Sequence, residues 1–235
     1  NGKNLDGWDG NPKFWSVRDG AITGQTTQEN PTKGNTFIIW RDGNVDDFEL
    51  RLQYKIINGN SGIQYRSKDL GNWVIGGYQG DFEAGNTYSG ILYEERGRGI
   101  LAQRGQMTSI ETNGDKHRVD VLGSLGASDD IQSHIKNEEW NDYKIIAVEN
   151  RFVHSINGRV TAIVIDNDAN KRVDSGLLAL QLHAGPPMTV QFRDIKILKL
   201  KPIQVGGTWN MEVFSDQGIG TPVFHFKQKD DVLSG

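Results

Sequence analysis

The sequence predicts an all-β protein, built as a two-sheet antiparallel jelly-roll sandwich over residues 1–201. Three observations indicate this fold: apolar residues recur with a period of two in most segments, Asp-Gly and Asn-Gly pairs separate alternating segments, and the helical period of 3.6 is nearly absent. Strands spaced in this way are typical of sandwiches and barrels. A chain of 235 residues is long enough for one large β domain with a small appendage.

The predicted elements follow one another along the chain with short turns between them. Asp19-Gly20 and Asn157-Gly158 each predict a tight hairpin, because such pairs favour the positive φ angles of a type I′ turn. The alternation after Thr189 changes phase between Phe192 and Ile195, which predicts a β-bulge. A single helical turn is expected within 129–140. Strand patterns cover residues 48–56, 143–150, 151–156, 159–166, 177–183 and 190–200.

The sequence pattern of residues 202–235 differs from that of the preceding chain. After Lys201-Pro202 the sequence contains two strand-like runs on either side of "DQGIG". Two strands by themselves are only marginally stable in water. We therefore interpret residues 202–235 as a β-hairpin tail, either the start of a truncated accessory β domain or an arm packed on the first domain.

Composition and charge exclude several classes of function. The net charge of −4 and the lack of a basic stripe argue against nucleic-acid binding. The chain has no cysteine, which excludes disulfides, thiolate nucleophiles and zinc sites built from cysteine. No stretch approaches the roughly 20 apolar residues of a transmembrane helix. Because the sequence opens at Asn1 with neither a methionine nor an apolar leader, we expect a processed or trimmed product from which any export signal is already removed.

The segment "GGYQGDFEAGNTYSGILYEERGRG", residues 76–99, combines both charge signs with four aromatic residues. Along a strand, Tyr78 and Phe82 would point to one face, whereas Gln79, Asp81 and Glu83 would point to the other. An amide and two carboxylates in a row can bind the hydroxyl groups of a sugar. The simpler alternative is a strand face that only meets solvent.

Two other strands repeat this arrangement. Gln181 and His183 alternate with leucines, and Gln64 and Arg66 alternate with apolar residues. If these strands share one sheet, their polar side chains line a groove. No HExxH, GxSxG, Walker or EF-hand pattern occurs. Although the phase of "GILYEE" is ambiguous, we expect one concave face to gather Arg66, Gln79, Asp81, Glu94 and His183.

Seven segments occur in a characteristic order: "NGKNLDGW", "FWSVRDGAITG", "NSGIQYR", "GGYQGDF", "SGILYEERGRGIL", "WNDYKIIAVENRFVHSINGRV" and "GLLALQLHAGPPMTVQFRDIKI". Together they resemble the 3-keto-disaccharide hydrolase family, and the likeness covers residues 1–198. It implies a concanavalin-like jelly roll, a fold shared with lectins and laminarinase-type glucanases, in an exported protein of the periplasm or the extracellular space. "GYQGD" and "LYEERGRG" resemble the version in which glutamine and aspartate stand where other members carry glutamate and glutamine.

The resemblance implies cleavage of glycosides that have been oxidised at C3. A ketone at C3 acidifies the C2 proton, so that a base can remove it, donors or a cation stabilise the enolate, and the C1 oxygen leaves. Water then adds to the unsaturated product. The implied catalytic residues are Asp81, Glu83, Glu94 and His183. The implied substrate contacts are Arg66 and Arg96 to the enolate, Trp73 and Tyr78 stacked on a sugar ring, and Gln79 and Gln181 to hydroxyl groups.

Three alternatives remain open at this point. A divalent cation acting as a Lewis acid could be held by Asp81, Glu94 and His183. A non-catalytic carbohydrate-binding module would bind ligand hydroxyls with Trp73, Gln79, Asp81 and Gln181. A laminarinase-like glycosidase would use Asp81 and Glu83, but such enzymes present three acids on one strand and position 79 is glutamine. Glu94 and His183, present in addition to the aromatic residues, favour the enzyme.

Overall fold

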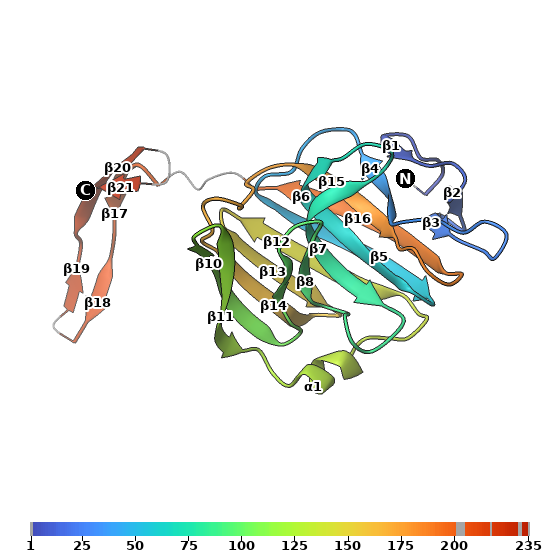
Figure 1. The fold of residues 1–235 in the computed structure, drawn as a ribbon. Coiled ribbons are helices and arrows are strands. Elements are labelled where there is room, and N and C mark those ends of the chain that lie inside the picture. Colours follow the sequence, from blue (N-terminus) through green and yellow to red (C-terminus); the bar gives the residue numbers. More distant parts are fainter. Residues whose placement is uncertain (1, 201–204, 217, 230–231, 235) are drawn as a thin grey trace. The chain divides into compact units, whose positions relative to one another are not determined.

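Strands dominate the computed structural model, which describes residues 2–200, 205–216, 218–229 and 232–234 (Figure 1). The chain divides into two compact units, Asn1–Lys199 and Leu200–Gly235. The boundary that the sequence predicts, at Lys201-Pro202, lies outside the described residues.

Two large sheets build the first unit. Sheet A has seven strands in the order β1 (Trp8–Gly10), β4 (Thr36–Trp40), β15 (Leu177–Leu182), β6 (Asn60–Asp69), β7 (Ile75–Glu83), β8 (Leu92–Glu95) and β9 (Gly99–Ala102). Sheet B has nine strands in the order β11 (Lys116–Ser124), β10 (Gln106–Asn113), β14 (Arg159–Asp166), β13 (Arg151–Ile156), β12 (Asn141–Val148), β5 (Phe48–Ile57), β16 (Thr189–Lys199), β3 (Ala21–Gln25) and β2 (Trp15–Arg18). The predicted two-sheet jelly roll is confirmed.

The pairing of neighbouring strands is antiparallel throughout the two sheets, with one exception in the described residues. β10 runs parallel to β14, with Gln106 opposite Ala162 and Ile110 opposite Asp166. Figure 1 shows the two sheets stacked face to face, with β5, β12, β13 and β16 behind β6, β7 and β8.

The inner faces of the two sheets form the apolar core. All five apolar residues that alternate along β5, from Phe48 to Ile56, are buried. Leu178, Leu180 and Leu182 of β15 enter the same core from sheet A. Because side chains alternate along a strand, burial of one set leaves the other set on the outer face of sheet A.

Both predicted hairpin turns and the predicted bulge are present. Asp19 and Gly20 have φ angles of 50° and 75°, and Asn157 and Gly158 have 49° and 79°, as a type I′ turn requires. The register of β16 against β5 shifts between Arg193 and Lys196. A short helix, α1 (Ser128–Ser133), forms within the segment where one turn is expected. No helix in the described part of the chain has the length and hydropathy that a bilayer crossing requires.

A second bulge, which the sequence does not predict, shapes sheet A. The register of β6 against β7 shifts between Tyr65 and Lys68, and Arg66 has a φ of 47°. Beyond the bulge, Trp73 O accepts a hydrogen bond from Phe37 N on β4 at 2.9 Å, although β15 and β6 lie between β4 and β7. The ends of β6 and β7 therefore curl over the outer face of the sheet.

This curl buries part of the outer face. A small second apolar cluster forms there from Phe37, Ile39, Ile75 and Ala179, all fully buried. The Trp73 indole also donates to Asp9 Oδ1 on β1 at 2.7 Å, which fastens the curled end to the far edge of the sheet. One end of the outer face is thus closed, and polar side chains occupy the other end.

The second unit consists of short strands. Its described strands are β17 (Gly207–Asn210), β18 (Val213–Ser215), β19 (Gly218–Gly220), β20 (Val223–Lys229) and β21 (Val232–Ser234). β18 pairs with β19 as a hairpin, and β17 pairs with β20, which pairs with β21. The interpretation of this unit as the start of an accessory domain stays a prediction.

Candidate functional site

Six polar side chains gather on the outer face of sheet A, at the end that the curl leaves open. Strand register groups them, because Gln64 on β6 lies opposite Gln79 on β7, which lies opposite Tyr93 on β8. Tyr78, the residue before Gln79 on β7, points to the other face and belongs to the core. The full set is Gln64, Gln79, Asp81, Tyr93, Glu95 and Gln181.

A row of hydrogen bonds ends at Asp81. Gln64 Nε2 donates to Gln79 Oε1 at 2.7 Å, and Gln79 Nε2 donates to Asp81 Oδ1 at 3.1 Å. Ser67 Oγ donates to Gln64 Oε1 at 2.6 Å and begins the row. All four side chains are buried. Each amide therefore has a fixed orientation with its N–H directed toward the carboxylate, and the Asp81 side chain is held in place.

Gly62 makes this row possible. It lies opposite Asp81 in the pairing of β6 with β7. A Cβ at position 62 would lie 2.4 Å from both Cγ and Cδ of Gln79, much closer than carbon atoms can approach. The Gln79 side chain thus passes directly over the backbone of position 62, which only a glycine allows.

The carboxyl group of Asp81 has an unusual pKa. Burial is the main reason that this pKa is raised to about 8; hydrogen bonds from Gln79 and Asn60 lower it, and the charges of Glu95 and Glu83 contribute to the rise. A carboxyl group whose pKa is near 8 exchanges its proton close to neutral pH. General acids and bases require this property, and such groups are enriched in active sites.

Glu95 connects the two sides of the face. Its Oε2 accepts a hydrogen bond from Gln181 Nε2 at 3.3 Å, and its Oε1 accepts one from Asn35 Nδ2 at 3.4 Å. β8 and β15 have two strands between them, so a flat sheet would hold them about 14 Å apart. The contact is possible because the sheet curves toward this face. Gln181 Oε1 is buried without a hydrogen-bond partner in the described residues, and it can accept from a ligand hydroxyl.

Tyr93 supplies a protonated hydroxyl beside these carboxylates. Burial raises the pKa of Tyr93, and the nearby charges of Glu95 and Asp81 raise it further. The phenol therefore keeps its proton at neutral pH. Such a group can donate a hydrogen bond to an oxyanion or a proton to a leaving oxygen.

His183 follows the end of β15 on the side of Gln181. Its Nδ1 lies 2.5 Å from the carbonyl oxygen of Ala184, so Nδ1 carries the proton and Nε2 of the neutral ring is left as an acceptor. Asn35 accepts from Ala184 N at 3.0 Å while it donates to Glu95. Asn35 therefore ties the segment that carries His183 to the Glu95 side of the site.

Two of the five residues predicted to converge on this face, Arg66 and Glu94, are elsewhere. Arg66 points away from it because the bulge in β6 reverses the alternation at that position. Its guanidinium is buried and donates to the backbone carbonyls of Asp46 and Glu149 and to Asp47 Oδ1, at 2.6–2.9 Å. Arg66 consequently cannot reach an enolate bound above Asp81, contrary to the expected convergence.

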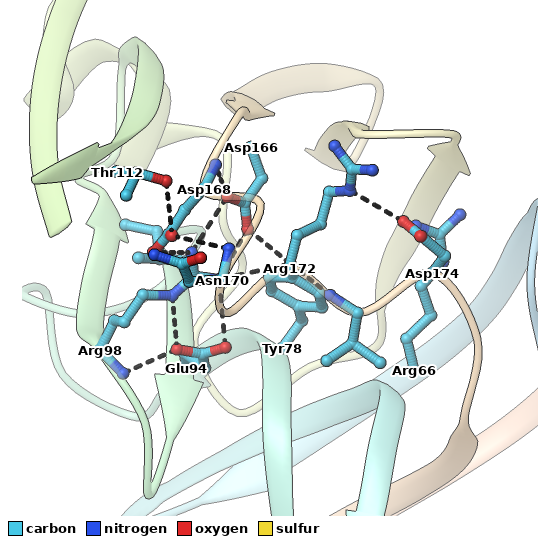
Figure 2. A network of polar contacts seen from close by, with 12 residues as sticks. Arg66, Tyr78, Glu94, Arg98, Thr112, Asp166, Asp168, Asn170, Arg172 and Asp174 are labelled. Atoms are coloured by element: carbon cyan, nitrogen blue, oxygen red, sulfur yellow. Dashed lines mark hydrogen bonds and ion pairs between the residues drawn. The ribbon is translucent and has the colours of Figure 1, made fainter. Parts of the chain in front are cut away.

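Glu94 and Tyr78 belong to a buried ion-pair network on the opposite side of the sheet (Figure 2). Arg98 Nε donates to Glu94 Oε2 at 2.8 Å, and its Nη2 donates to Asp166 Oδ2 at 2.6 Å. Tyr78 donates to the same Asp166 oxygen at 2.5 Å. The phase of β8 is therefore the reverse of the predicted one: Tyr93 and Glu95 face the site and Glu94 does not. Tyr78 is fully buried and cannot stack on a sugar.

The remaining predicted residues have separate positions. Glu83 Oε1 accepts from the backbone N–H groups of Thr87 and Tyr88 and holds the loop after β7. The Trp73 indole is half-buried and bonded to Asp9. Arg96 is exposed in the turn between β8 and β9. The structure brings together Gln79, Asp81 and Gln181, with His183 on the same side.

The possible cation site is not assembled. Glu94 pairs with Arg98, away from Asp81 and His183. In the described residues no three histidine, aspartate or glutamate side chains are grouped closely enough to hold a metal ion. These three residues do not fit a shared cation.

Residues 1–198 match a family model described as a 3-keto-alpha-glucoside-1,2-lyase-like domain. No curated protein sequence matches the chain. Solved structures with the same fold include a candidate glycosyl hydrolase from Parabacteroides distasonis, with 19% identity and a TM-score of 0.55 over 84% of this chain and 96% of that one.

Two proteins from Bacillus subtilis also share the fold. One has a galectin-like fold and no known function, with 14% identity and a TM-score of 0.56 over 83% of this chain and 90% of that one. The other is the carbohydrate-binding module CBM66, with 14% identity and a TM-score of 0.50 over 81% of this chain and 94% of that one. At these identities the likeness shows the jelly-roll fold alone.

Proposed function

The chain belongs to the 3-keto-alpha-glucoside-1,2-lyase-like family, and from that premise we propose that the outer face of sheet A binds 3-keto-glycosides and eliminates the group on C1. The single observation that carries this proposal is the buried Asp81 carboxyl, whose pKa is raised to about 8 beside the protonated hydroxyl of Tyr93. One group can take a proton near neutral pH and the other can donate a hydrogen bond. Elimination beside a ketone needs both.

In the proposed reaction the Asp81 carboxylate removes the C2 proton. The electron pair of the C2–H bond forms an enolate with its charge on the C3 oxygen, and Tyr93 O–H is the donor that stabilises this charge. The enolate then collapses, a double bond forms between C1 and C2, and the C1–oxygen bond breaks. The departing alkoxide takes the proton that Asp81 removed from C2, and His183 Nε2, an acceptor, takes a proton from the water that adds at C1 and returns it to C2. Addition of water across the new double bond completes hydrolysis, and without it the product stays unsaturated.

The ketone is essential to this chemistry. Without it the C2 proton is far too weakly acidic for a carboxylate, so the parent glycoside should not react. Gln181 Oε1 and the half-buried Asn60 supply acceptor and donor groups for ring hydroxyls at the same site. Export of the protein, expected from the sequence, remains a prediction.

The test compares a 3-keto-glucoside with the matching unmodified glucoside, with and without a chelator. We expect cleavage of the oxidised sugar alone, and a loss of about 100-fold or more in kcat for Asp81→Asn and for His183→Ala. Asp81→Asn keeps the size of the side chain, so a loss of activity reports the missing base. Equal cleavage of both sugars would identify an ordinary glycosidase and contradict the proposal.

A binding module is the second candidate. It is favoured by one observation, the set of buried glutamine amides around an acceptor that lacks a partner. If the wild-type protein binds the glycosides tightly and cleaves neither, the binding module is the correct interpretation.

A further inference from the structure

A cavity of about 760 Å³ lies beside the site, between the curled end of sheet A and the loop after β14. Its volume is within the range of small-molecule sites, about 300–1,000 Å³. Seven lysine or arginine residues and two glutamates contribute to its lining, although the whole chain carries a net charge of −4. Positive charge is therefore concentrated in this one concave region.

The guanidinium groups at the floor of the cavity are already paired with carboxylates. Arg98 forms ion pairs with Glu94 and Asp166 in the network of Figure 2, and Asp168 Oδ2 lies 3.4 Å from Arg98 Nη1. Arg66 is paired with Asp47. These guanidinium groups are 1% exposed, so they have no remaining capacity for an outside anion.

The rim of the cavity is different. Lys68 at the end of β6, Arg96 in the turn after β8 and Lys116 at the start of β11 are exposed, and no described carboxylate lies within ion-pair distance of them. Within the described residues, Lys171 Nζ donates only to the backbone carbonyl of Asp115, at 3.2 Å. Four cations from separate segments thus surround one space with no carboxylate bound to them.

Arg96 also adopts a backbone conformation that an arginine rarely adopts. Its φ of 54° lies in the left-handed region, where a residue with a Cβ is strained by about 1–2 kcal/mol relative to glycine. A glycine or asparagine would form this turn more easily. The turn thus places the Arg96 charge at the mouth of the cavity, despite the strain.

The cavity and the outer face of sheet A share Glu95. This residue lines the cavity and also bonds Gln181 at the site. We propose that the cavity binds an acidic sugar residue through its carboxylate or sulfate group, held by Lys68, Arg96, Lys116 and Lys171, while the adjoining sugar residue lies over Asp81. The cavity is thus an anionic subsite, and the placement of the adjoining residue rests on the proposed function.

The test measures binding of unoxidised sugars by calorimetry, so that catalysis plays no part. The probes are a glucuronic acid–glucose disaccharide, a monosulfated glucose disaccharide, a neutral glucose disaccharide and inorganic sulfate, each at low and moderate ionic strength. We expect the acidic disaccharides to bind at least about tenfold more tightly than the neutral one, with a preference that declines as salt is added.

Variants locate the effect. Lys68→Gln/Lys116→Gln should reduce the ratio of acidic to neutral affinity about tenfold. The control Lys13→Gln/Lys196→Gln removes two exposed charges outside the cavity and should leave this ratio unchanged. Equal affinity for acidic and neutral disaccharides, or equal effects of the two double variants, would overturn the inference.

Two further outcomes separate the inference from the proposed function. If inorganic sulfate binds as tightly as the acidic disaccharides, the cavity is a simple anion site and the sugar subsite is wrong. If the acidic preference holds but a 3-keto-glucoside is not cleaved, the elimination mechanism fails and the anionic subsite stands.

Discussion

The carboxylate of Glu95 accepts a hydrogen bond from Gln181 across two intervening strands, with 3.3 Å between Oε2 and Nε2. This contact keeps a negative charge close to Asp81 and contributes to the raised pKa of that residue. The same glutamate lines the basic cavity. In the proposed reaction Glu95 is therefore a positioning residue whose charge acts through Asp81, and its effects should appear in the pH dependence of that reaction.

The activity of the wild-type protein should depend on the protonation of Asp81. In the proposed reaction Asp81 acts as a base in its carboxylate form, so kcat/KM for a 3-keto-glucoside should rise with pH and level off above an apparent pKa of about 8. Glu95→Gln keeps the size of the side chain but removes the charge, so the apparent pKa should fall. Initial rates from pH 6 to 9.5, roughly spanning that pKa, measure both profiles.

Glu49→Gln is the control, because Glu49 lies on β5 of the other sheet. Its pH profile should match that of the wild-type protein. A profile that falls as pH rises through 8 would mean that Asp81 acts as an acid instead.

Stability supplies an independent check on the pKa of Asp81. The raised pKa means that the folded protein loses stability as pH rises from about 4 to about 8, so Asp81→Asn should be more stable than wild type at pH above 8.

Gly62→Ala should shift the same profile in the opposite direction. The new Cβ would lie 2.4 Å from Gln79, so the amide must move and its hydrogen bond to Asp81 weakens. Because that bond lowers the pKa of Asp81, the apparent pKa of kcat/KM should rise above that of the wild type. Overpacking should also reduce the free energy of unfolding by about 1–3 kcal/mol.

Gly123→Ala provides the matched control. Position 123 lies on β11, and a Cβ there meets no atom within 4 Å. This variant should retain the wild-type profile and stability. If Gly62→Ala lowers stability but leaves the pH profile unchanged, Gln79 does not control the protonation of Asp81.

Most of the fold could be predicted from the sequence because the relevant signals are local. A hairpin with two central residues fixes its own register, and alternation over β5 is long enough to define a buried face. The same reasoning placed Gln79 and Asp81 together, since both lie on one strand, and Tyr78 and Phe82, which flank them, are buried.

The site residues that sequence reasoning missed depend on non-local registers. β8 is joined to β7 by residues 84–91, and a loop of this length does not fix which residue pairs with Gln79. The observed partner is Tyr93, which brings Glu95 to the site and sends Glu94 to Arg98. Only knowledge of which residue of β8 pairs with Gln79 would have predicted Tyr93 and Glu95 at the site.

Arg66 was misplaced for a related reason. A bulge adds one residue and reverses every side chain after it, and "QYRSK" contains no glycine or proline that would mark the position. The bulge depends on tertiary contacts: the buried Arg66 guanidinium binds backbone carbonyls of residues 46 and 149. The alternation of apolar and polar residues in the sequence does not reveal such contacts.

The last prediction concerns His154, which lies fully buried between two tyrosines. Its Nε2 is 3.0 Å from the hydroxyl of Tyr65 and its Nδ1 is 3.3 Å from that of Tyr143. Burial lowers the pKa of His154 to about 3, so the folded protein keeps the ring neutral. In the unfolded chain the ring binds a proton below its ordinary pKa of about 6.5. Stability should therefore decline as pH falls from about 6.5 toward 3, by up to about 1.4 kcal/mol per pH unit.

His154→Gln tests this expectation, because an amide can still donate and accept between the two tyrosines but does not titrate. Urea unfolding between about pH 7.5 and 4.5 should give a smaller loss of stability in the variant than in the wild type. His134→Gln, at an exposed position after α1, should show the full wild-type loss. Asp81 also makes the free energy of unfolding depend on pH over this range, with the opposite sign. This contribution is common to all three proteins, so it cancels in the comparison. Equal losses in the wild type and His154→Gln would show that the buried ring is not the source of acid sensitivity.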